Sequence, residues 1–225
     1  MRTGKGQVLE LILESGFRHV RIACAVDMIP SPGQYLLAGI ASHADPLPVP
    51  LYSTESTPQG FTACAPISDT WTPGTDITLR GPFGRGFVLP SLARKVVLVQ
   101  FDGTPSRILG LIQPSLDQGA DVVIVSDSNG ERLPDEVEMH PLSALEEILG
   151  WGDYIAFDVL REKLSDLMER LGGMKQILAR KEAQILIQTP VPCGGVAECG
   201  VCAVNFGSNW KMACREGPVF DLRDL

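Results

Sequence analysis

The chain has 225 residues, of which 44% are hydrophobic and 20% charged, a composition typical of one large or two modest globular domains. A net charge of −8 without any cluster of Lys or Arg excludes a nucleic-acid-binding surface. No apolar run reaches the ~20 residues of a membrane span, and the N-terminal residues are too acidic for a secretory signal. We therefore expect a cytoplasmic protein with neither nucleic acid nor membrane as a partner.

Residues 1–92 predict a small β-barrel. Short strand-like runs are separated by turn signals at regular intervals, which is typical of all-β folds. Between two of these runs, Pro46, Pro48 and Pro50 predict an extended loop that enters a strand. The expected strands cover residues 19–26, 31–40, 60–67 and 75–81.

Residues 93–189 predict an α/β domain with a mostly parallel sheet. Continuous apolar runs, as found in buried parallel strands, alternate there with segments of helical spacing. Pro114 is expected to interrupt the first helix. The expected buried strands are residues 95–101, 120–127 and 183–190, and the expected helices are residues 106–119, 143–150 and 162–172.

The last segment, residues 190–225, contains four cysteines in the pattern C-x5-C-x2-C-x11-C. They are Cys193, Cys199, Cys202 and Cys214. Plant-type ferredoxins bind a [2Fe–2S] cluster with C-x4-C-x2-C and a distant fourth Cys, so the spacing here is one residue longer. The pattern predicts that the four thiols ligate a [2Fe–2S] cluster.

The residues between the cysteines support this prediction. Gly194, Gly195 and Gly200 permit the positive φ values of a tight loop, and they let backbone N–H groups approach the cluster sulfurs. Residues 203–206 and 210–213 read as two strands around a Gly-Ser-Asn turn. Such a hairpin would bring Cys214 back beside Cys202.

Other interpretations of these cysteines stay open. A four-cysteine zinc site is the strongest, although zinc ribbons usually offer two C-x2-C knuckles and only Cys199 and Cys202 form one here. Disulfides fit a secreted protein better, and unligated thiols are seldom this dense. Cys24 and Cys64 stand alone in apolar stretches, and we expect both in the core.

Several motifs together resemble one family. A barrel with PGQ-Y and Y-S, a GPFGRGF turn, an α/β unit and a cysteine loop that ends in CREGPVF are similar to the electron-transfer subunit of dihydroorotate dehydrogenase, in the ferredoxin reductase superfamily. The resemblance covers nearly the whole chain. It implies FAD in the barrel, a pyridine nucleotide in the α/β domain, a [2Fe–2S] cluster in the C-terminal loop, and a role in pyrimidine biosynthesis.

The resemblance also assigns the flavin-binding residues. The family's R-x-Y-S motif is matched by Tyr52 and Ser53, but Pro50 stands in the Arg position and cannot donate to the FAD pyrophosphate. We therefore expect FAD that is weakly held. The family's GPxGxGF turn passes close to the flavin, and it is matched by Gly81, Pro82, Gly84, Gly86 and Phe87.

The nucleotide motif departs further from the family. After the first α/β strand, Gly103 is the single glycine left of the family's run, and Asp102 places a negative charge where a pyrophosphate would lie. Thr104, Pro105 and Ser106 resemble the following turn, and Arg107 comes next. We expect no NAD binding of the family's kind.

The sequence thus predicts an electron-transfer subunit that passes electrons through its cluster to or from a partner flavoprotein or dehydrogenase subunit, in a hetero-oligomer. A structural or regulatory subunit that keeps only the cluster, and a zinc-stapled binding module, are the alternatives. We assign no catalytic residue. His19, His43 and His140 lie apart in surface-like segments, and Asp153 and Asp158 are expected in solvated loops.

Overall fold

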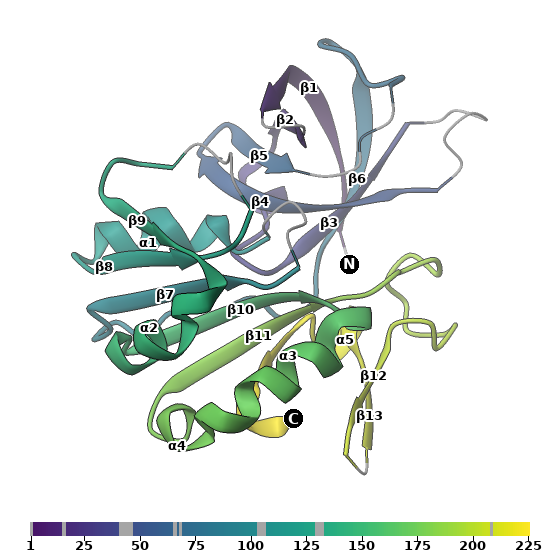
Figure 1. Ribbon diagram of the computed structural model, residues 1–225. Coiled ribbons are helices and arrows are strands. Elements are labelled where there is room, and N and C mark those ends of the chain that lie inside the picture. The colour runs from purple at the N-terminus through teal and green to yellow at the C-terminus, as the bar shows by residue number, and fades with distance from the viewer. Residues whose placement is uncertain are drawn as a thin grey trace.

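The fold has two bodies, a β-barrel and an α/β unit, as Figure 1 shows for this computed structural model. The structure describes residues 2–14, 17–40, 47–64, 67, 69–102, 107–128, 133–207 and 209–225. The barrel is formed by the N-terminal part of the chain, and the α/β unit lies beside it. Among the described residues, no helix has the length and apolar character needed to cross a bilayer.

The barrel is closed by six antiparallel strands in the order β1-β2-β5-β4-β3-β6. This confirms the predicted barrel, but the long first strand was not predicted. Gly4 and Gly6 made this stretch look broken, yet each leaves room for a core side chain: a Cβ at Gly6 would lie 2.8 Å from Leu79. The strands are β1 (Arg2–Glu14), β2 (Phe17–Cys24), β3 (Tyr35–Gly39), β4 (Val49–Thr57), β5 (Gly60–Cys64) and β6 (Asp76–Phe83).

Alternation along each strand decides which side chains fill the barrel. In β2, Val20 and Ile22 are fully buried in the barrel core, whereas Arg21 between them is exposed. Cys64 is buried as expected, and Cys24 is half-buried at the edge of the same core. The outward row of residues on β3 and β4 faces the α/β unit, so this row decides what can lie between the two bodies.

The α/β unit is built on a six-stranded sheet in the order β14-β11-β10-β7-β8-β9. Its neighbouring strands are parallel except for β14, an antiparallel edge strand from the C-terminal tail. This confirms the predicted parallel sheet. The strands are β7 (Lys95–Gln100), β8 (Asp121–Val125), β9 (Val137–His140), β10 (Tyr154–Leu160), β11 (Glu182–Gln188) and β14 (Val219–Asp221).

Helices and turns cover both faces of this sheet (Figure 1). On one face the turn Leu109–Leu111 and α1 (Ile112–Asp117) pack on β7 and β8. On the other face lie α2 (Leu145–Trp151), α3 (Leu164–Leu171) and α4 (Lys175–Leu178). Pro114 does not interrupt a helix, contrary to the prediction. It lies in the first turn of α1, where its missing N–H has no helical partner to lose.

The C-terminal segment leaves the sheet at the end of β11 and returns to it in β14. In between, β12 (Ala203–Phe206) and β13 (Asn209–Met212) form the predicted antiparallel hairpin, followed by the short helix α5 (Ala213–Glu216). Phe220 in β14 is buried and packs with Phe206 at a ring distance of 4.7 Å. The hairpin is therefore anchored on the α/β unit.

Candidate metal centre at the C-terminal thiols

The four C-terminal cysteines begin directly after the carboxyl end of β11. The hairpin brings Cys214 beside Cys202, as predicted, with the two Sγ atoms 3.2 Å apart. Both of these side chains are buried, whereas Cys193 is half-buried and Cys199 exposed. The Cys193 sulfur in turn interacts with the Cys199 side chain. The thiols thus stand in two pairs, one inside the protein and one nearer its surface.

The loop between the thiols has the backbone conformation that its glycines predict. Gly194, Gly195 and Gly200 have φ values of 70°, 80° and 71°, and Ala197 shares this conformation at φ 61°. Gly195 also needs its missing side chain, because a Cβ there would lie 3.2 Å from the Phe83 ring and 3.3 Å from the Tyr35 hydroxyl. The loop is therefore folded tightly against the barrel.

In this fold of the loop, several backbone N–H groups donate hydrogen bonds to the sulfur of Cys193. Burial raises the pKa of Cys193, but hydrogen bonds from the N–H of Glu198, from the Cys199 side chain and from the Val196 and Cys199 N–H groups outweigh it and lower the pKa to about 6. N–H groups that converge on one sulfur favour its thiolate, which is the form that binds metals.

The inner pair is held differently. Burial and the adjacent Cys202 thiol raise the pKa of Cys214 to about 12, against a hydrogen bond from the Ala197 N–H. The Cys214 thiol, whose sulfur lies 3.2 Å from that of Cys202, therefore keeps its proton unless a cation takes the place of that proton. The inner pair has the donor chemistry of a metal site, and both side chains also belong to the buried core of the α/β unit.

The pairing of the thiols can be compared with the ligand set of a binuclear cluster. Among the described residues, no three His, Cys, Asp or Glu side chains converge in a way that could hold one metal ion. A [2Fe–2S] cluster takes its four thiolates as two on each iron. The two thiol pairs, the tight loop and the converging N–H groups are what such a group requires.

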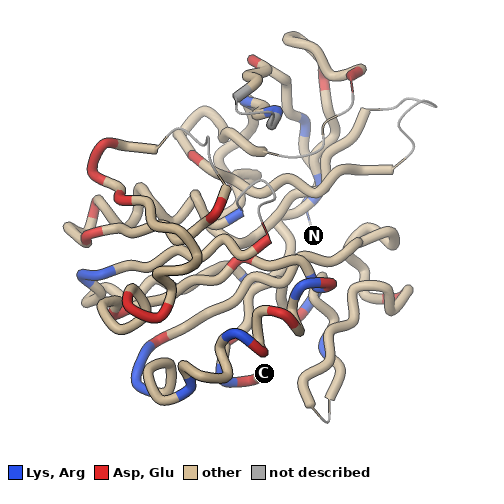
Figure 2. The backbone as a smooth tube through the Cα atoms, viewed as in Figure 1, with Lys and Arg blue, Asp and Glu red and all other residues tan. Residues whose placement is uncertain are grey.

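Two arginines that sequence reasoning missed hold the loop. Arg161, just after β10, donates to the carbonyl oxygens of Val201 and Ala203. Arg80 on β6 lies beside Gly194, where a Cβ would come within 3.1 Å of its guanidinium. Neither residue belongs to a recognisable motif, so only the fold brings them to the thiols. Between Pro190 and Cys214 the chain carries just two charged residues, Glu198 and Lys211, and its tube is mostly tan in Figure 2.

The residues predicted to bind flavin are covered by the chain itself. Tyr52 is 5% exposed and lies in a buried cluster with Leu186 of β11 and Val219 of β14. The Ser53 hydroxyl donates to the Glu55 carbonyl and shares a hydrogen bond of 2.7 Å with Ser56. At these positions the described side chains offer no open face on which a flavin ring could stack.

The glycines of the GPFGRGF turn serve close packing. A Cβ at Gly84 would lie 2.5 Å from the Gly217 carbonyl oxygen, and a Cβ at Gly86 would lie 2.6 Å from that of Pro32. Phe87 donates its N–H to the same Pro32 carbonyl oxygen, and Pro82 follows Gly81 through a cis peptide bond. The turn thus joins the barrel to the C-terminal tail.

The edge of the sheet where a nucleotide would bind is filled by a buried ion cluster. Arg107 donates from its backbone N–H and its Nε to Asp158, at 2.6 Å and 2.8 Å, and its guanidinium lies 3.7 Å from Asp102. Asp102 also accepts from the Leu160 N–H. The Asp102 and Asp158 side chains are 2% and 1% exposed. Residues 103–106, which carry the rest of the predicted turn, lie outside the described residues.

Asp158 corrects one prediction. It is not in a solvated loop, because it faces Arg107 at the end of β10, whereas Asp153 is exposed as expected. Burial raises the pKa of the Asp158 carboxyl, and the charge and hydrogen bonds of Arg107 oppose that shift. Arg107 is thus committed to carboxylates of its own chain.

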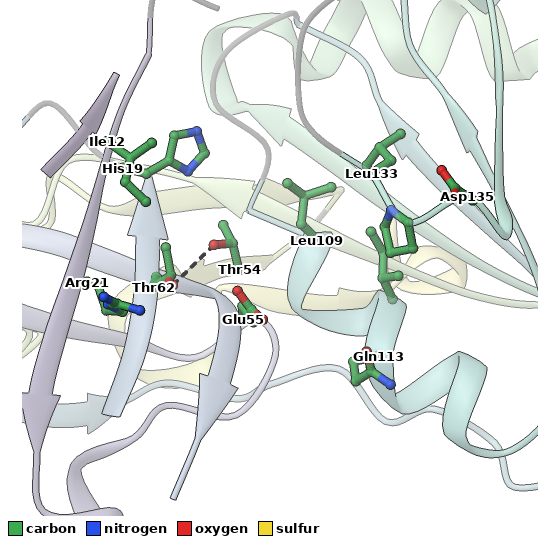
Figure 3. A pocket seen from close by; sticks show the side chains of 12 residues that line it. Ile12, His19, Arg21, Thr54, Glu55, Thr62, Leu109, Gln113, Leu133 and Asp135 are labelled. Carbon is green, nitrogen blue, oxygen red and sulfur yellow. Dashed lines mark hydrogen bonds between the residues drawn. The ribbon is translucent and has the colours of Figure 1, made fainter. Parts of the chain in front are cut away.

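A separate cavity of about 640 Å³ opens between the barrel and α1 (Figure 3). Its walls combine apolar residues such as Leu109 and Leu133 with the polar Thr54, Glu55 and His19. His19 is 8% exposed, which corrects the prediction of a surface position. His140 is half-buried beside Glu138, and His43 lies outside the described residues. No described histidine is near the thiols.

Solved structures share this architecture. The ferredoxin reductase of carbazole 1,9a-dioxygenase in its FAD apo form is 14% identical, with a TM-score of 0.55, and the match covers 76% of this chain and 63% of that one. The Amycolatopsis cytochrome P450 reductase GcoB is 13% identical, with a TM-score of 0.61, and the match covers 83% of this chain and 69% of that one. The FAD/NAD-binding domain of nitric oxide dioxygenase from Vibrio cholerae is 13% identical, with a TM-score of 0.57, and the match covers 82% of this chain and 99% of that one.

The chain has the ferredoxin-reductase fold. This confirms the predicted two-body architecture, a barrel followed by an α/β unit. The chain spans less than two thirds of the length of the carbazole dioxygenase reductase. No model of a known protein family matches the sequence.

Proposed function

We propose that the protein is an electron-transfer subunit that carries a [2Fe–2S] cluster on Cys193, Cys199, Cys202 and Cys214. The observation that carries this proposal is the arrangement of the thiols in two pairs, with the inner Sγ atoms 3.2 Å apart and backbone N–H groups directed at the Cys193 sulfur. The electron-transfer chemistry of proteins with this fold supports it, since reductases are among them.

The residues of the chain have distinct roles in this proposal. When bound, the cluster accepts and releases one electron at a time. Cys202 and Cys214 hold its buried side, and Cys193 and Cys199 hold the side nearer solvent. Arg161 fixes the loop through the Val201 and Ala203 carbonyl oxygens, and the N–H groups that favour the Cys193 thiolate stabilise added negative charge.

The partner is proposed to be a flavoprotein or dehydrogenase subunit, similar to the catalytic subunit of dihydroorotate dehydrogenase. Exposed apolar side chains neighbour the outer thiol pair along the loop, with Val196 and Val201 at 45% and 40% exposure. Such a patch beside a redox group suits docking to another protein. The GPVF tail is not part of it, because Val219 and Phe220 are buried against the chain's own sheet.

We propose that FAD binds to this protein only weakly. A ferredoxin NADP+ reductase from Neisseria gonorrhoeae with a similar fold is described with bound FAD and NADP, which supports a flavin here. Against tight binding stand Pro50, which offers no phosphate donor, and Tyr52, which is covered. We expect low FAD occupancy after purification and no NAD site of the kind that the resemblance implies, because Asp102, Arg107 and Asp158 already occupy that edge.

The decisive experiment is the visible and paramagnetic resonance spectrum of protein purified without oxygen, together with iron, sulfide and zinc analysis. We expect cluster absorption bands, a [2Fe–2S] signal on reduction, and about two irons and two sulfides per chain. Cluster bands without any flavin would favour the structural or regulatory subunit. A colourless protein with one zinc and no acid-labile sulfide would contradict the proposal and favour a binding module whose cysteines hold a structural zinc ion.

A further inference from the structure

Tyr35 carries a buried hydroxyl group that has no hydrogen-bond partner among the described residues. The residue lies at the start of β3, on the barrel face that meets the α/β unit, and it is 1% exposed. Its hydroxyl oxygen forms no hydrogen bond with any of the described residues. Buried hydroxyl groups are normally satisfied, and a Phe would fill the same space without this cost. The hydroxyl therefore calls for a partner that the described residues do not supply.

The hydroxyl points toward the cysteine loop. It would lie 3.3 Å from a Cβ at Gly195, which places it against the backbone between Cys193 and Cys199. Cys214, Cys202 and Cys193 all interact electrostatically with it. The Tyr35 ring is fixed in this direction by Phe83, whose ring centre is 5.5 Å away, and by Tyr52 at 5.7 Å. The aromatic cluster thus holds one donor at the edge of the thiol site.

We propose that Tyr35 donates a hydrogen bond to a sulfur atom of the cluster, a Cys thiolate or a bridging sulfide, and thereby raises the reduction potential of the cluster. This inference rests on the proposed function. Tyr35 is a positioning and tuning residue and ligates no iron. Reduction adds negative charge to the cluster sulfurs, so a fixed donor stabilises the reduced form more than the oxidised one.

The state of the hydroxyl suits this role. A tyrosine hydroxyl keeps its proton at neutral pH, so the group acts as a donor. Gly195 contributes by having no side chain between the hydroxyl and the loop. The two residues come from opposite ends of the chain, and their approach depends on the packing of the loop against β3 and β6.

The test compares wild-type protein with Tyr35→Phe. The cluster is assembled in both proteins under exclusion of oxygen, and its reduction is then followed by paramagnetic resonance in a redox titration. At a fixed potential, we expect the ratio of reduced to oxidised cluster to fall roughly three- to tenfold in the variant; tenfold corresponds to about 59 mV for one electron. In wild-type protein, one proton that couples to the reduced cluster should be lost from the spectrum on transfer to deuterated water. Tyr35→Phe should lack this coupling in both solvents. The control is Tyr154→Phe, which removes the buried hydroxyl that donates to Gln184 and should leave the titration unchanged.

A second variant keeps the test decisive if Tyr35→Phe fails to fold. The chain has three tyrosines, and replacing all of them by 3-fluorotyrosine makes each hydroxyl a stronger donor without changing its shape. The reduced fraction at fixed potential should then rise. A bound cluster whose titration is the same in all these proteins would overturn the role of Tyr35. Absence of iron and sulfide from wild-type protein would instead overturn the proposed function.

Discussion

The carboxyl edge of the sheet offers two places for a ligand, and the chain treats them in opposite ways. After β7 and β10, Arg107 forms a buried cluster with Asp102 and Asp158, and Tyr52 is covered beside it. After β11, the chain instead turns through glycines and brings sulfur atoms to within 3.2 Å of each other. One place is filled with paired charges, and the other gathers four thiols that stand in two pairs.

This difference is informative because a fold alone does not fix function. Among the described residues, the nucleotide edge carries a cation, Arg107, that pairs with the Asp102 and Asp158 carboxylates. The cysteine loop keeps backbone donors, thiols and an apolar rim. Buried ions that pair with one another give the first place a structural role within the chain. Cys202 and Cys214 also pack in the core of the α/β unit, but their paired thiols have in addition the donor chemistry of a metal site.

The largest effect is expected at the cysteine loop. Cys202→Ser replaces a buried thiol of the inner pair by a hydroxyl, which is a poor ligand for a cluster iron, so bound iron should fall from about two per chain to near zero. Cys24→Ser is the matched control, because Cys24 is a half-buried thiol of β2 in the barrel. Iron analysis and the visible spectrum measure both variants. A full cluster in Cys202→Ser would remove this residue from the ligand set.

The second effect should appear at the ion cluster as a loss of stability. Arg107→Met removes the cation between two buried carboxylates, and breaking a buried pair in this way typically costs about 3–5 kcal/mol in the free energy of unfolding. Asp158→Asn is the control, because it keeps an acceptor for Arg107 and removes one negative charge. Its cost should be clearly smaller. Urea unfolding measures both, and equal losses would mean that charge balance does not matter at this edge.

Sequence reasoning reached the fold through periodicity and turn residues. Continuous apolar runs identified β7, β8 and β11, and a Gly-Ser-Asn turn predicted the hairpin of β12 and β13. It missed β1, because glycines in that strand serve core neighbours that are distant in sequence. It also missed β14, whose three residues form a strand only because β11 offers them an edge.

The candidate site divides in the same way. Spacing alone brought out the four thiols, since ligands of one cluster must be close along the chain or across a hairpin. The supporting residues Tyr35, Arg80 and Arg161 come from the barrel and from β10, and no local pattern marks them. Asp158 was misread because its partner Arg107 is 51 residues away. Long-range pairing is what a single sequence hides.

A smaller effect is expected for flavin at the barrel. Pro50 lines a cavity of about 300 Å³ beside Leu160 and Val191, and it stands where the flavin motif has an Arg. Pro50→Arg should strengthen FAD binding roughly tenfold, the value of one charge-assisted hydrogen bond to a phosphate. Pro48→Arg is the control, since it adds the same charge to the same cavity outside the motif. Flavin fluorescence titration measures both. Equal binding by the two variants would attribute the gain to charge alone.

At the nucleotide edge of the sheet we expect no activity with NADH. The isolated chain, supplied with FAD and a dye as acceptor, should not oxidise NADH above the rate without protein. The physical reason is that a pyrophosphate would have to approach the Asp102 carboxylate, and the nearby Arg107 is already bound to Asp158. Chemically reduced protein should still pass electrons to the dye, which shows that the cluster is competent in the same sample. Steady NADH-dependent dye reduction would mean that the ion cluster opens for the nucleotide, and the two places on the sheet edge would then be alike after all.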